Sequence, residues 1–300
     1  MTRAIFPALA LAALTPVLFA SAPAVAAAGT LVHTDRISVT VTGQGPDVIL
    51  IPGLASSAHV WDATVAQLSP HYRLHVVQVA GFADTEPNGN ASGPVLEPTL
   101  VAIHEYIVAN HLQAPAVIGH SLGGLIAMKL AIDHPAEVAR LMIVDSLPFA
   151  GLMAGPQATV ASIEPMAARM RGKLLASTQE EYAHTEPASM AKLVKSDGPA
   201  AKMAIAAASA SDRRVVAQAL YDDFTTDLRP DLARIKQPVT MLYPWDAADG
   251  ASQAAMDSLY KSAFATLPQA KLRRIDGSFH FIMIDQPQAF GLAVDAFLAN

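Results

Sequence analysis

The chain has 300 residues, of which 52% are hydrophobic and 15% charged, and its formal net charge is -6. So apolar a composition can bury a large core, which excludes an intrinsically disordered chain. The mild negative charge gives no reason to expect nucleic acid or an anionic membrane as a partner. The chain has no cysteine, which excludes disulfides and thiolate metal sites, and no metal or other cofactor is expected.

Residues 1–28 have the features of a secretory signal peptide. Arg3 precedes an apolar stretch over residues 5–20, and Ala24-Val25-Ala26 fits the small-x-small pattern of a cleavage site. Prolines interrupt the apolar stretch, which favours a cleaved signal over a membrane anchor. We therefore expect a periplasmic or secreted protein that keeps no stable association with the membrane after cleavage. No oligomeric state is predicted.

Beyond this segment, short apolar runs alternate with helical patterns. Residues 36–42 alternate apolar and polar side chains, as in a half-exposed edge strand, whereas residues 47–51 form a continuous β-branched run typical of a buried strand. Further strands are predicted at residues 73–79, 115–118, 141–144, 239–243 and 272–275, and helices at residues 58–68, 96–111, 122–133, 252–267 and 288–298. This alternation predicts an α/β fold with a mostly parallel sheet and helices on both faces.

The alternation breaks once, over residues 146–236. This segment shows no convincing strand, only helical stretches rich in alanine, methionine and charged residues. We therefore predict an α/β core domain, formed by residues 29–145 and 237–300, with residues 146–236 inserted as a helical lid over the catalytic edge.

The sequence Gly119-His120-Ser121-Leu122-Gly123 lies between a predicted strand and a predicted helix. Glycines on both sides of a serine suit a sharp strand-to-helix turn that exposes the hydroxyl group. Ser121 is therefore the candidate nucleophile. His120 adjoins it, but its side chain is expected to point elsewhere and to pack against neighbours.

A serine nucleophile needs a base and a group that orients the base. His280 follows the last predicted strand and precedes a helix, and it is the candidate base. Asp246, after the strand at residues 239–243, is the first choice for the orienting carboxylate, because the C-terminal end of that strand is expected to face His280. The resulting order Ser121, Asp246, His280 is the one expected for this turn. Asp249 and Asp145 remain alternatives: Asp249 precedes a glycine turn, and Asp145 ends the strand that follows the serine helix.

Two backbone N–H groups are candidates for an oxyanion hole. The N–H group of Leu122 follows the nucleophile at a helix N-terminus, where the helix dipole favours negative charge. The second is expected in the loop after the strand at residues 47–51, where Gly53 permits a tight turn and Leu54 follows.

From about residue 36 to residue 300 the chain resembles the α/β-hydrolases. The resemblance is carried by Ile51-Pro52-Gly53-Leu54, by Gly119-His120-Ser121-Leu122-Gly123-Gly124 and by Phe279-His280-Phe281-Ile282. It implies an eight-stranded sheet, a helical lid after strand six and a Ser-His-acid triad. Two features depart from the family pattern: Pro52-Gly53 replaces the usual His-Gly, and the loop Tyr243-Pro244-Trp245-Asp246 lacks the glycine that many members carry before the acid.

A serine nucleophile disfavours the haloalkane dehalogenase and epoxide hydrolase relatives, which use an aspartate. Methionine and leucine side chains along the lid would suit an apolar substrate group, or they would only pack the lid helices against the core, which is the commoner role of such residues. We therefore expect a hydrolase that cleaves small or medium apolar carboxylic esters through an acyl-enzyme. The alternatives are a cofactor-free perhydrolase or haloperoxidase, a carbon–carbon bond hydrolase, and a non-catalytic small-molecule receptor.

Overall fold

The computed structural model describes residues 30–299, with only the backbone of Asp249 included. The predicted signal peptide, residues 1–28, lies outside the described residues. The described strands are β1 (Thr30–His33), β2 (Ile37–Thr42), β3 (Asp47–Ile51), β4 (Arg73–Val79), β5 (Ala116–His120), β6 (Arg140–Val144), β7 (Val239–Trp245) and β8 (Ala270–Asp276).

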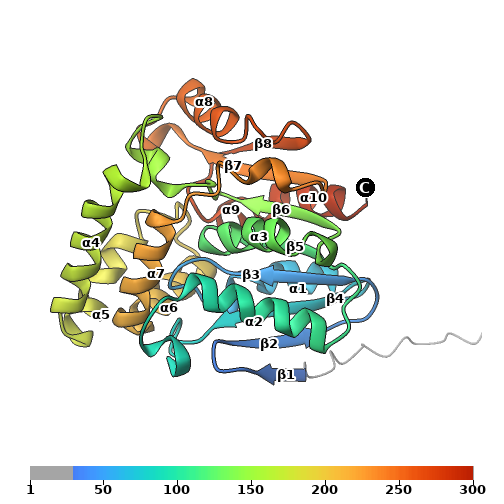
Figure 1. The fold of residues 1–300 in the computed structure, drawn as a ribbon, viewed down its shortest axis with the longest axis horizontal. Helices are drawn as coiled ribbons and strands as arrows, with labels where there is room; N and C mark the ends of the chain where they lie inside the picture. The colour runs from blue at the N-terminus through green and yellow to red at the C-terminus, as the bar shows by residue number, and fades with distance from the viewer. Residues whose placement is uncertain (1–29, 300) are drawn as a thin grey trace, which may run out of the picture.

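These eight strands form one sheet in the order β1-β2-β4-β3-β5-β6-β7-β8 (Figure 1). β2 pairs antiparallel with β1 and β4, and every further pairing, from β4–β3 to β7–β8, is parallel. The predicted α/β fold with a mostly parallel sheet is confirmed. The sequence pattern does not predict β1, because three of its four residues are exposed and it carries no buried face.

Helices cover both faces of the sheet. α2 and α3 lie on one face, and α1 and α10 lie on the other (Figure 1). The helices outside the lid are α1 (Asp62–Leu68), α2 (Leu96–Ala109), α3 (Leu122–Asp133), α8 (Gln253–Ala263), α9 (Ile282–Asp285) and α10 (Pro287–Leu298). Short 3-10 helices occur at Ala58–Trp61, Asn88–Ala91, Pro135–Glu137, Ala150–Ala154, Leu232–Arg234 and Ala247–Asp249.

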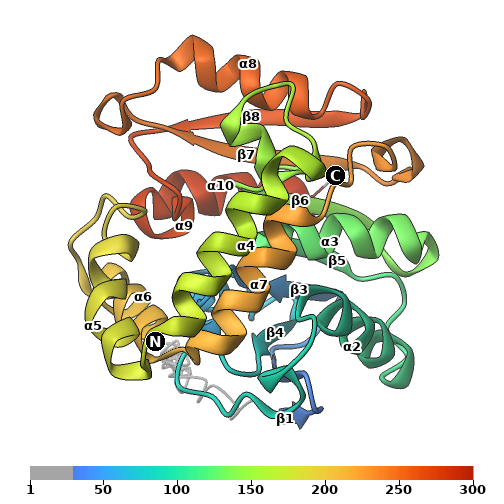
Figure 2. The ribbon, with the colours of Figure 1, turned by 60° about the vertical axis from the view of Figure 1, so that its left-hand side comes forward.

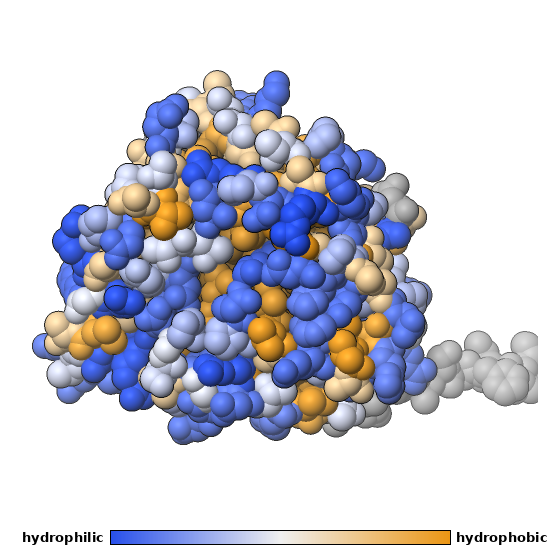
Figure 3. Space-filling view, viewed as in Figure 1, coloured by the Kyte–Doolittle hydropathy of each residue, from blue (hydrophilic) through white to orange (hydrophobic). Residues whose placement is uncertain are grey.

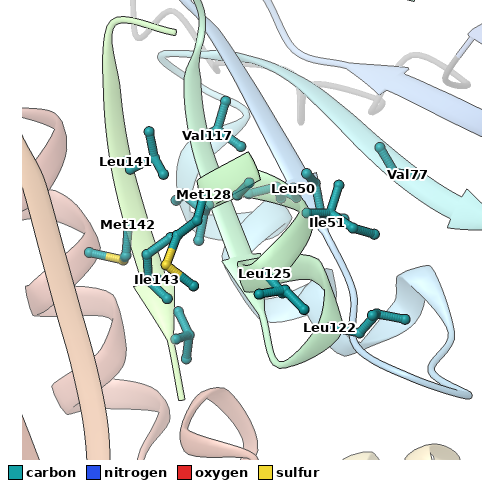
Figure 4. Close-up of a cluster of buried hydrophobic side chains, with 14 of the residues drawn as sticks. Leu50, Ile51, Val77, Val117, Leu122, Leu125, Met128, Leu141, Met142 and Ile143 are labelled. Atoms are coloured by element: carbon teal, nitrogen blue, oxygen red, sulfur yellow. The ribbon is translucent and has the colours of Figure 1, made fainter. Parts of the chain in front are cut away.

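The strand that leads to Ser121 lies within the hydrophobic core. All five residues of β5 are buried, as expected for a strand covered on both faces. Leu125 and Met128 of α3 lie among side chains of β3, β5 and β6 (Figure 4). Burial of a leucine or methionine side chain typically stabilises a fold by about 1.5–3 kcal/mol. The candidate nucleophile thus follows a strand that is buried along its whole length.

The lid, residues 146–236, contains no strand in the structure. Its long helices are α4 (Val160–Ala176), α5 (Gln179–Met190), α6 (Pro199–Ala210) and α7 (Arg213–Thr225). α4 packs along α7, and α5 packs along α6 (Figure 2). All four helices lie beyond one end of the sheet (Figure 1). Thr159 and Thr178 begin α4 and α5 with capping boxes, in which side chains satisfy backbone N–H groups of the first turn.

The surface is mostly hydrophilic, with small scattered hydrophobic patches on the face shown in Figure 3. The most exposed large apolar side chains include Leu31, Met153 and Leu292, which belong to separate elements. Among the described residues, no helix has both the length and the apolar character that a membrane span requires.

Candidate active site

Ser121 occupies the turn between β5 and α3 in a conformation that few residues adopt. Its φ is +54° and its ψ is -124°. A Cβ atom on Gly119 would lie 2.2 Å from the Gly123 carbonyl oxygen, and one on Gly123 would lie 2.3 Å from the Ile51 carbonyl oxygen. Both glycines are therefore required for this close approach, and the strained turn presents the serine at the carboxyl end of the sheet. This geometry is what the sequence motif predicts.

His280 lies in the loop between β8 and α9, and its partner is Asp145. The His280 Nδ1 and Asp145 Oδ2 atoms are 2.5 Å apart. Asp145 follows β6 directly and has a positive φ of +45°. Its N–H donates to the Leu242 carbonyl at 2.8 Å, which anchors the turn to β7. The carboxylate that orients His280 is therefore that of Asp145, which the sequence offered only as an alternative to Asp246.

The prediction that Asp246 orients His280 is wrong. The Asp246 carboxylate accepts hydrogen bonds from the Lys195 ammonium and from the N–H of Ala248. The hydrogen bond with Lys195 holds the pKa of Asp246 below its ordinary value. The side chain of Asp249, the other alternative, lies outside the described part of the structure.

Strand register explains why Asp145 replaces Asp246. Val144 pairs with Leu242, so Asp145 lies level with Tyr243 at the end of the sheet. β7 continues through Trp245, which pairs with Asp276 of β8. Asp246 is thus three residues further along, about 10 Å at the usual rise of a strand. It extends past the histidine toward the lid.

A second side chain holds the far oxygen of Asp145. Tyr260, on α8, donates its hydroxyl hydrogen to Asp145 Oδ1. Burial, followed by the neighbouring Asp145 charge, raises the pKa of Tyr260 well above its ordinary value, so the phenol stays protonated. The Tyr260 ring stacks on Tyr243, whose hydroxyl donates to Asp257 at 2.9 Å. Sequence reasoning did not identify Tyr260, since nothing in its helical surroundings points to the site.

His120 supports the backbone of the histidine loop. Its Nε2 atom is 3.0 Å from the His280 carbonyl oxygen, and its ring lies 4.5 Å from the His280 ring. Burial lowers the pKa of His120 well below its ordinary value, so the ring is neutral and donates from Nε2 to that carbonyl. His120 is therefore a packing neighbour with one directed hydrogen bond.

Asp285 joins the histidine loop to the lid. Its carboxylate accepts from the N–H of Phe279 at 2.9 Å, and from the N–H groups of Lys195 and Ser196 at 3.0 and 2.8 Å. Lys195 and Ser196 belong to the lid segment between α5 and α6. Three backbone donors on one carboxylate fix the lid relative to His280.

Both candidate oxyanion donors lie next to Ser121: Leu54 lines the same cavity, and Leu122 follows Ser121 in the chain. Leu122 is the first residue of α3, and Leu54 lies in the loop after β3. A Cβ atom on Gly53 would lie 2.9 Å from the Ser121 Cβ atom, so this loop touches the serine. Within residues 30–299, neither the Leu54 nor the Leu122 N–H group donates a hydrogen bond. Both remain available, as the prediction requires.

A cavity of about 720 Å³ opens beside these residues, between the sheet and the lid. Ser121, His280 and Leu54 form its floor, and helices α4, α5 and α7 form its walls. The apolar wall side chains are Met170, Leu174, Met190, Leu193, Val216, Leu220 and Phe281. Such a mixture of apolar walls with a few polar groups is typical of small-molecule sites.

One cluster outside this cavity has metal-ligand residue types. His104, His134 and Glu137 have side-chain ligand atoms within 4.8 Å of one another. The two imidazoles stack with their planes 12° and their ring centroids 3.8 Å apart, so their in-plane nitrogen lone pairs lie in separate, nearly parallel planes and do not meet at one point. His104 Nδ1 instead pairs with Glu137 at 2.9 Å, which makes this a surface contact between α2 and the end of α3.

Comparison with known proteins identifies the family of the chain. The model of the alpha/beta hydrolase fold family matches residues 46–287. A pimeloyl-(acyl-carrier protein) methyl ester esterase of Aeromonas hydrophila is 35% identical over 112 residues, 37% of this chain and 42% of that protein. The chain thus matches less than half the length of the first such relatives. The corresponding esterase of Edwardsiella ictaluri is 28% identical over 84% of this chain and 92% of that protein.

The fold is shared with solved structures. A hydrolase from Pseudomonas aeruginosa superposes with a TM-score of 0.74 at 22% identity, over 91% of this chain and 98% of that one. With a family match over most of its length, the chain belongs to the alpha/beta hydrolase fold family.

Proposed function

We propose that this protein is a serine hydrolase that cleaves carboxylic esters through an acyl-enzyme intermediate. The observation that carries the proposal is that Ser121 and His280 line one cavity, with Asp145 paired to His280 behind it. The relatives named as esterases support ester chemistry.

In the proposed mechanism, the Ser121 oxygen attacks the ester carbonyl carbon while His280 Nε2 takes the serine proton. Asp145 accepts from Nδ1, which fixes the tautomer that leaves Nε2 free and stabilises the imidazolium as it forms. The tetrahedral intermediate collapses when His280 returns the proton to the leaving alcohol oxygen. Water then attacks the acyl-serine, with His280 again acting as the base. The bond to the serine oxygen breaks as His280 returns the proton to it, which releases the carboxylic acid and restores Ser121.

The N–H groups of Leu54 and Leu122 are proposed to stabilise the negative charge on the former carbonyl oxygen. Both lack a partner among residues 30–299, and the Leu122 N–H also lies at the N-terminus of α3. A single oxyanion donor typically lowers the barrier by about 3 kcal/mol. Two such donors would supply much of the catalytic effect.

The cavity supports a small or medium substrate. Its volume of about 720 Å³ lies within the usual range for small-molecule sites, and methionine and leucine side chains line much of it. Methionine is flexible and fits irregular apolar groups. We propose that an acyl chain or another apolar group lies along this wall during turnover.

The test is hydrolysis of p-nitrophenyl esters from acetate to palmitate by the chain without residues 1–28. Turnover by wild type that disappears in Ser121→Ala supports the proposal, and the chain length with the highest kcat/KM measures the usable cavity. Circular dichroism of both proteins confirms that the variant folds. Folded wild type that cleaves none of these esters contradicts the proposal and favours peroxide or carbon–carbon chemistry.

We also propose that the protein acts outside the cytoplasm. The proposal rests on the sequence of residues 1–28 alone, which carries the features of an export signal. Mass spectrometry of protein recovered from the periplasm or the medium should show an N-terminus near Ala26. Full-length protein retained in the cytoplasm would contradict it.

A further inference from the structure

Helix α7 presents one polar side chain on an otherwise apolar face. Val216, Leu220 and Asp223 are spaced four and three residues apart, so they lie along one side of the helix, and all three line the catalytic cavity. The neighbouring Asp222 points elsewhere: its carboxylate accepts from the N–H groups of Val95 and Leu96 at the start of α2. Asp222 thus has a structural role, whereas Asp223 faces the cavity.

The Asp223 carboxyl group has no hydrogen bond and no ion pair among the residues that the structure describes. Burial raises its pKa to about 7, although the nearby His280 acts in the opposite direction. An unpaired carboxyl group in such a position costs stability, and a leucine or asparagine would fill the same space without that cost. Groups that are costly to the fold and face a catalytic cavity are candidates for ligand recognition.

The charged groups around the cavity are mostly acidic. Glu181 is occupied at the start of α5, where it accepts from the N–H of Thr178 at 2.7 Å. Glu186 is half-buried on α5 without a side-chain partner in residues 30–299, and burial raises its pKa. Lys173, exposed in the last turn of α4, is the one basic side chain other than histidine among the described lining residues. The cavity therefore favours a positive ligand group over a negative one.

We propose that Asp223 binds a substituted or primary ammonium group of the substrate, so that the enzyme prefers cationic esters over neutral esters of the same shape. This inference rests on the proposed ester hydrolase function and names its substrate class. It adds a positive group to the apolar substrate expected from the cavity walls.

Two physical effects produce the preference. A cationic group beside the half-buried Asp223 would form an ion pair with the carboxylate, and also a charge-assisted hydrogen bond where it carries an N–H. The same ammonium group would otherwise oppose the positive charge that develops on His280 during attack. The Asp223 carboxylate offsets that repulsion, so its removal should penalise cationic esters most.

The test uses three methyl esters with equal chain length. Methyl 6-aminohexanoate carries a positive terminal group, methyl heptanoate a neutral one and monomethyl heptanedioate a negative one. Acetylcholine and 3,3-dimethylbutyl acetate form a second pair, with the positive or neutral group on the alcohol side. We expect wild type to show a kcat/KM at least roughly tenfold higher for the cation in at least one set, with the anion slowest.

The variant Asp223→Asn keeps the shape of the side chain and removes its charge. We expect its cation-to-neutral ratio of kcat/KM to fall to about one or below. Glu180→Gln is the matched control, because Glu180 is an exposed carboxylate of the same lid that does not line the cavity. That control should keep the wild-type ratio. A cation preference that survives in Asp223→Asn overturns the inference.

Binding separates this inference from the proposed function. Calorimetric titration of Ser121→Ala with the same esters measures affinity without turnover, and Ser121→Ala/Asp223→Asn repeats it without the carboxylate. Tighter binding of the cation that depends on Asp223 supports the inference even where no ester is cleaved. Ser121-dependent hydrolysis without any preference for the cation overturns the inference and leaves the ester hydrolase proposal in place.

Discussion

The polar side chains at the carboxyl end of the sheet are hydrogen-bonded to one another, whereas two polar side chains of the lid are not. At the carboxyl end of the sheet, Asp145 accepts hydrogen bonds from both His280 and Tyr260, and His120 donates a hydrogen bond to the His280 carbonyl. In the lid, Asp223 and Glu186 face the same cavity with no side-chain partner in the described part of the chain. The comparison indicates that the sheet supplies fixed chemical groups, whereas the lid leaves groups free for a ligand.

The largest expected effect is a difference in kcat between substitutions of Asp145 and Asp246, which follow the neighbouring strands β6 and β7. Asp145→Asn should lower kcat by about 10³-fold or more, because an amide cannot favour the required tautomer of His280 or stabilise its charge. Asp246→Asn should change kcat by less than about threefold, since Asp246 contacts Lys195 and not His280. The measurement is steady-state hydrolysis of one p-nitrophenyl ester by both variants.

The two substitutions control for each other, because each changes one carboxylate to an amide at the end of a parallel strand. Similar melting temperatures would show that both proteins fold. A large loss of kcat in Asp246→Asn with little change in Asp145→Asn would restore the sequence-based assignment and contradict the geometry.

The next effect concerns the stability of the lid. The pKa of Asp223 is about 7 in the folded protein, against an ordinary value of 3.8. Between these values the folded state binds more protons than the unfolded state, so this group makes stability fall as pH rises from about 4 to 7, with no further change above. Asn does not titrate. Asp223→Asn should therefore be more stable than wild type at pH 8 by on the order of 2 kcal/mol, allowing for the side open to the cavity.

Urea unfolding of both proteins at pH 4.5 and pH 8 measures this difference. The gain from Asp223→Asn should be present at pH 8 and should largely vanish at pH 4.5, where the carboxyl is protonated in the folded state. Other groups titrate equally in both proteins and cancel in the comparison. A gain that is the same at both pH values would show that the carboxyl is not buried at a cost.

Patterns of neighbouring residues were enough to predict the sheet, the Ser121 turn and the position of His280. The buried run before Ser121 and the glycines around it encode a turn that only those residues can form. His280 was found because it follows the last strand. Both features depend on residues that are neighbours in the chain, so they can be recognised from the sequence.

The acid could not be chosen from local sequence. Its identity depends on the register between β6 and β7, where Val144 pairs with Leu242, and on the extension of β7 through Trp245. The predicted strand ended at residue 243, which placed Asp246 too near the site. The positive φ of Asp145 is a structural sign of its role, but no sequence motif marks it. Asp223 was missed because its role depends on how the lid packs.

A smaller effect is expected from the tyrosine behind the acid. Tyr260→Phe removes the hydroxyl donor to Asp145 Oδ1 and keeps the ring that stacks on Tyr243. Loss of one hydrogen bond to a charged group should lower kcat by about tenfold and leave KM within about twofold. A change in KM alone would indicate a packing role. Tyr243→Phe, which removes a hydroxyl that contacts Asp257, is the matched control and should retain kcat.

The smallest effect is expected where the lid meets the loop after β7. Lys195 pairs with Asp246 across this contact, but the Lys195 side chain is 45% exposed, and exposed ion pairs contribute little. Lys195→Met should lower the melting temperature by less than about 2 °C and leave kcat/KM within about twofold. Added 0.5 M NaCl should remove the difference between the variant and wild type, because salt screens an exposed pair.

The reason for so small an effect is that the lid has a second attachment at the same residue. The backbone N–H groups of Lys195 and Ser196 donate to Asp285, and no substitution of the lysine side chain removes those bonds. Asp285 also accepts from Phe279, so the lid and the His280 loop share one anchor. A large, salt-resistant loss of activity in Lys195→Met would mean that the Lys195–Asp246 pair, and not Asp285, positions the lid over the cavity.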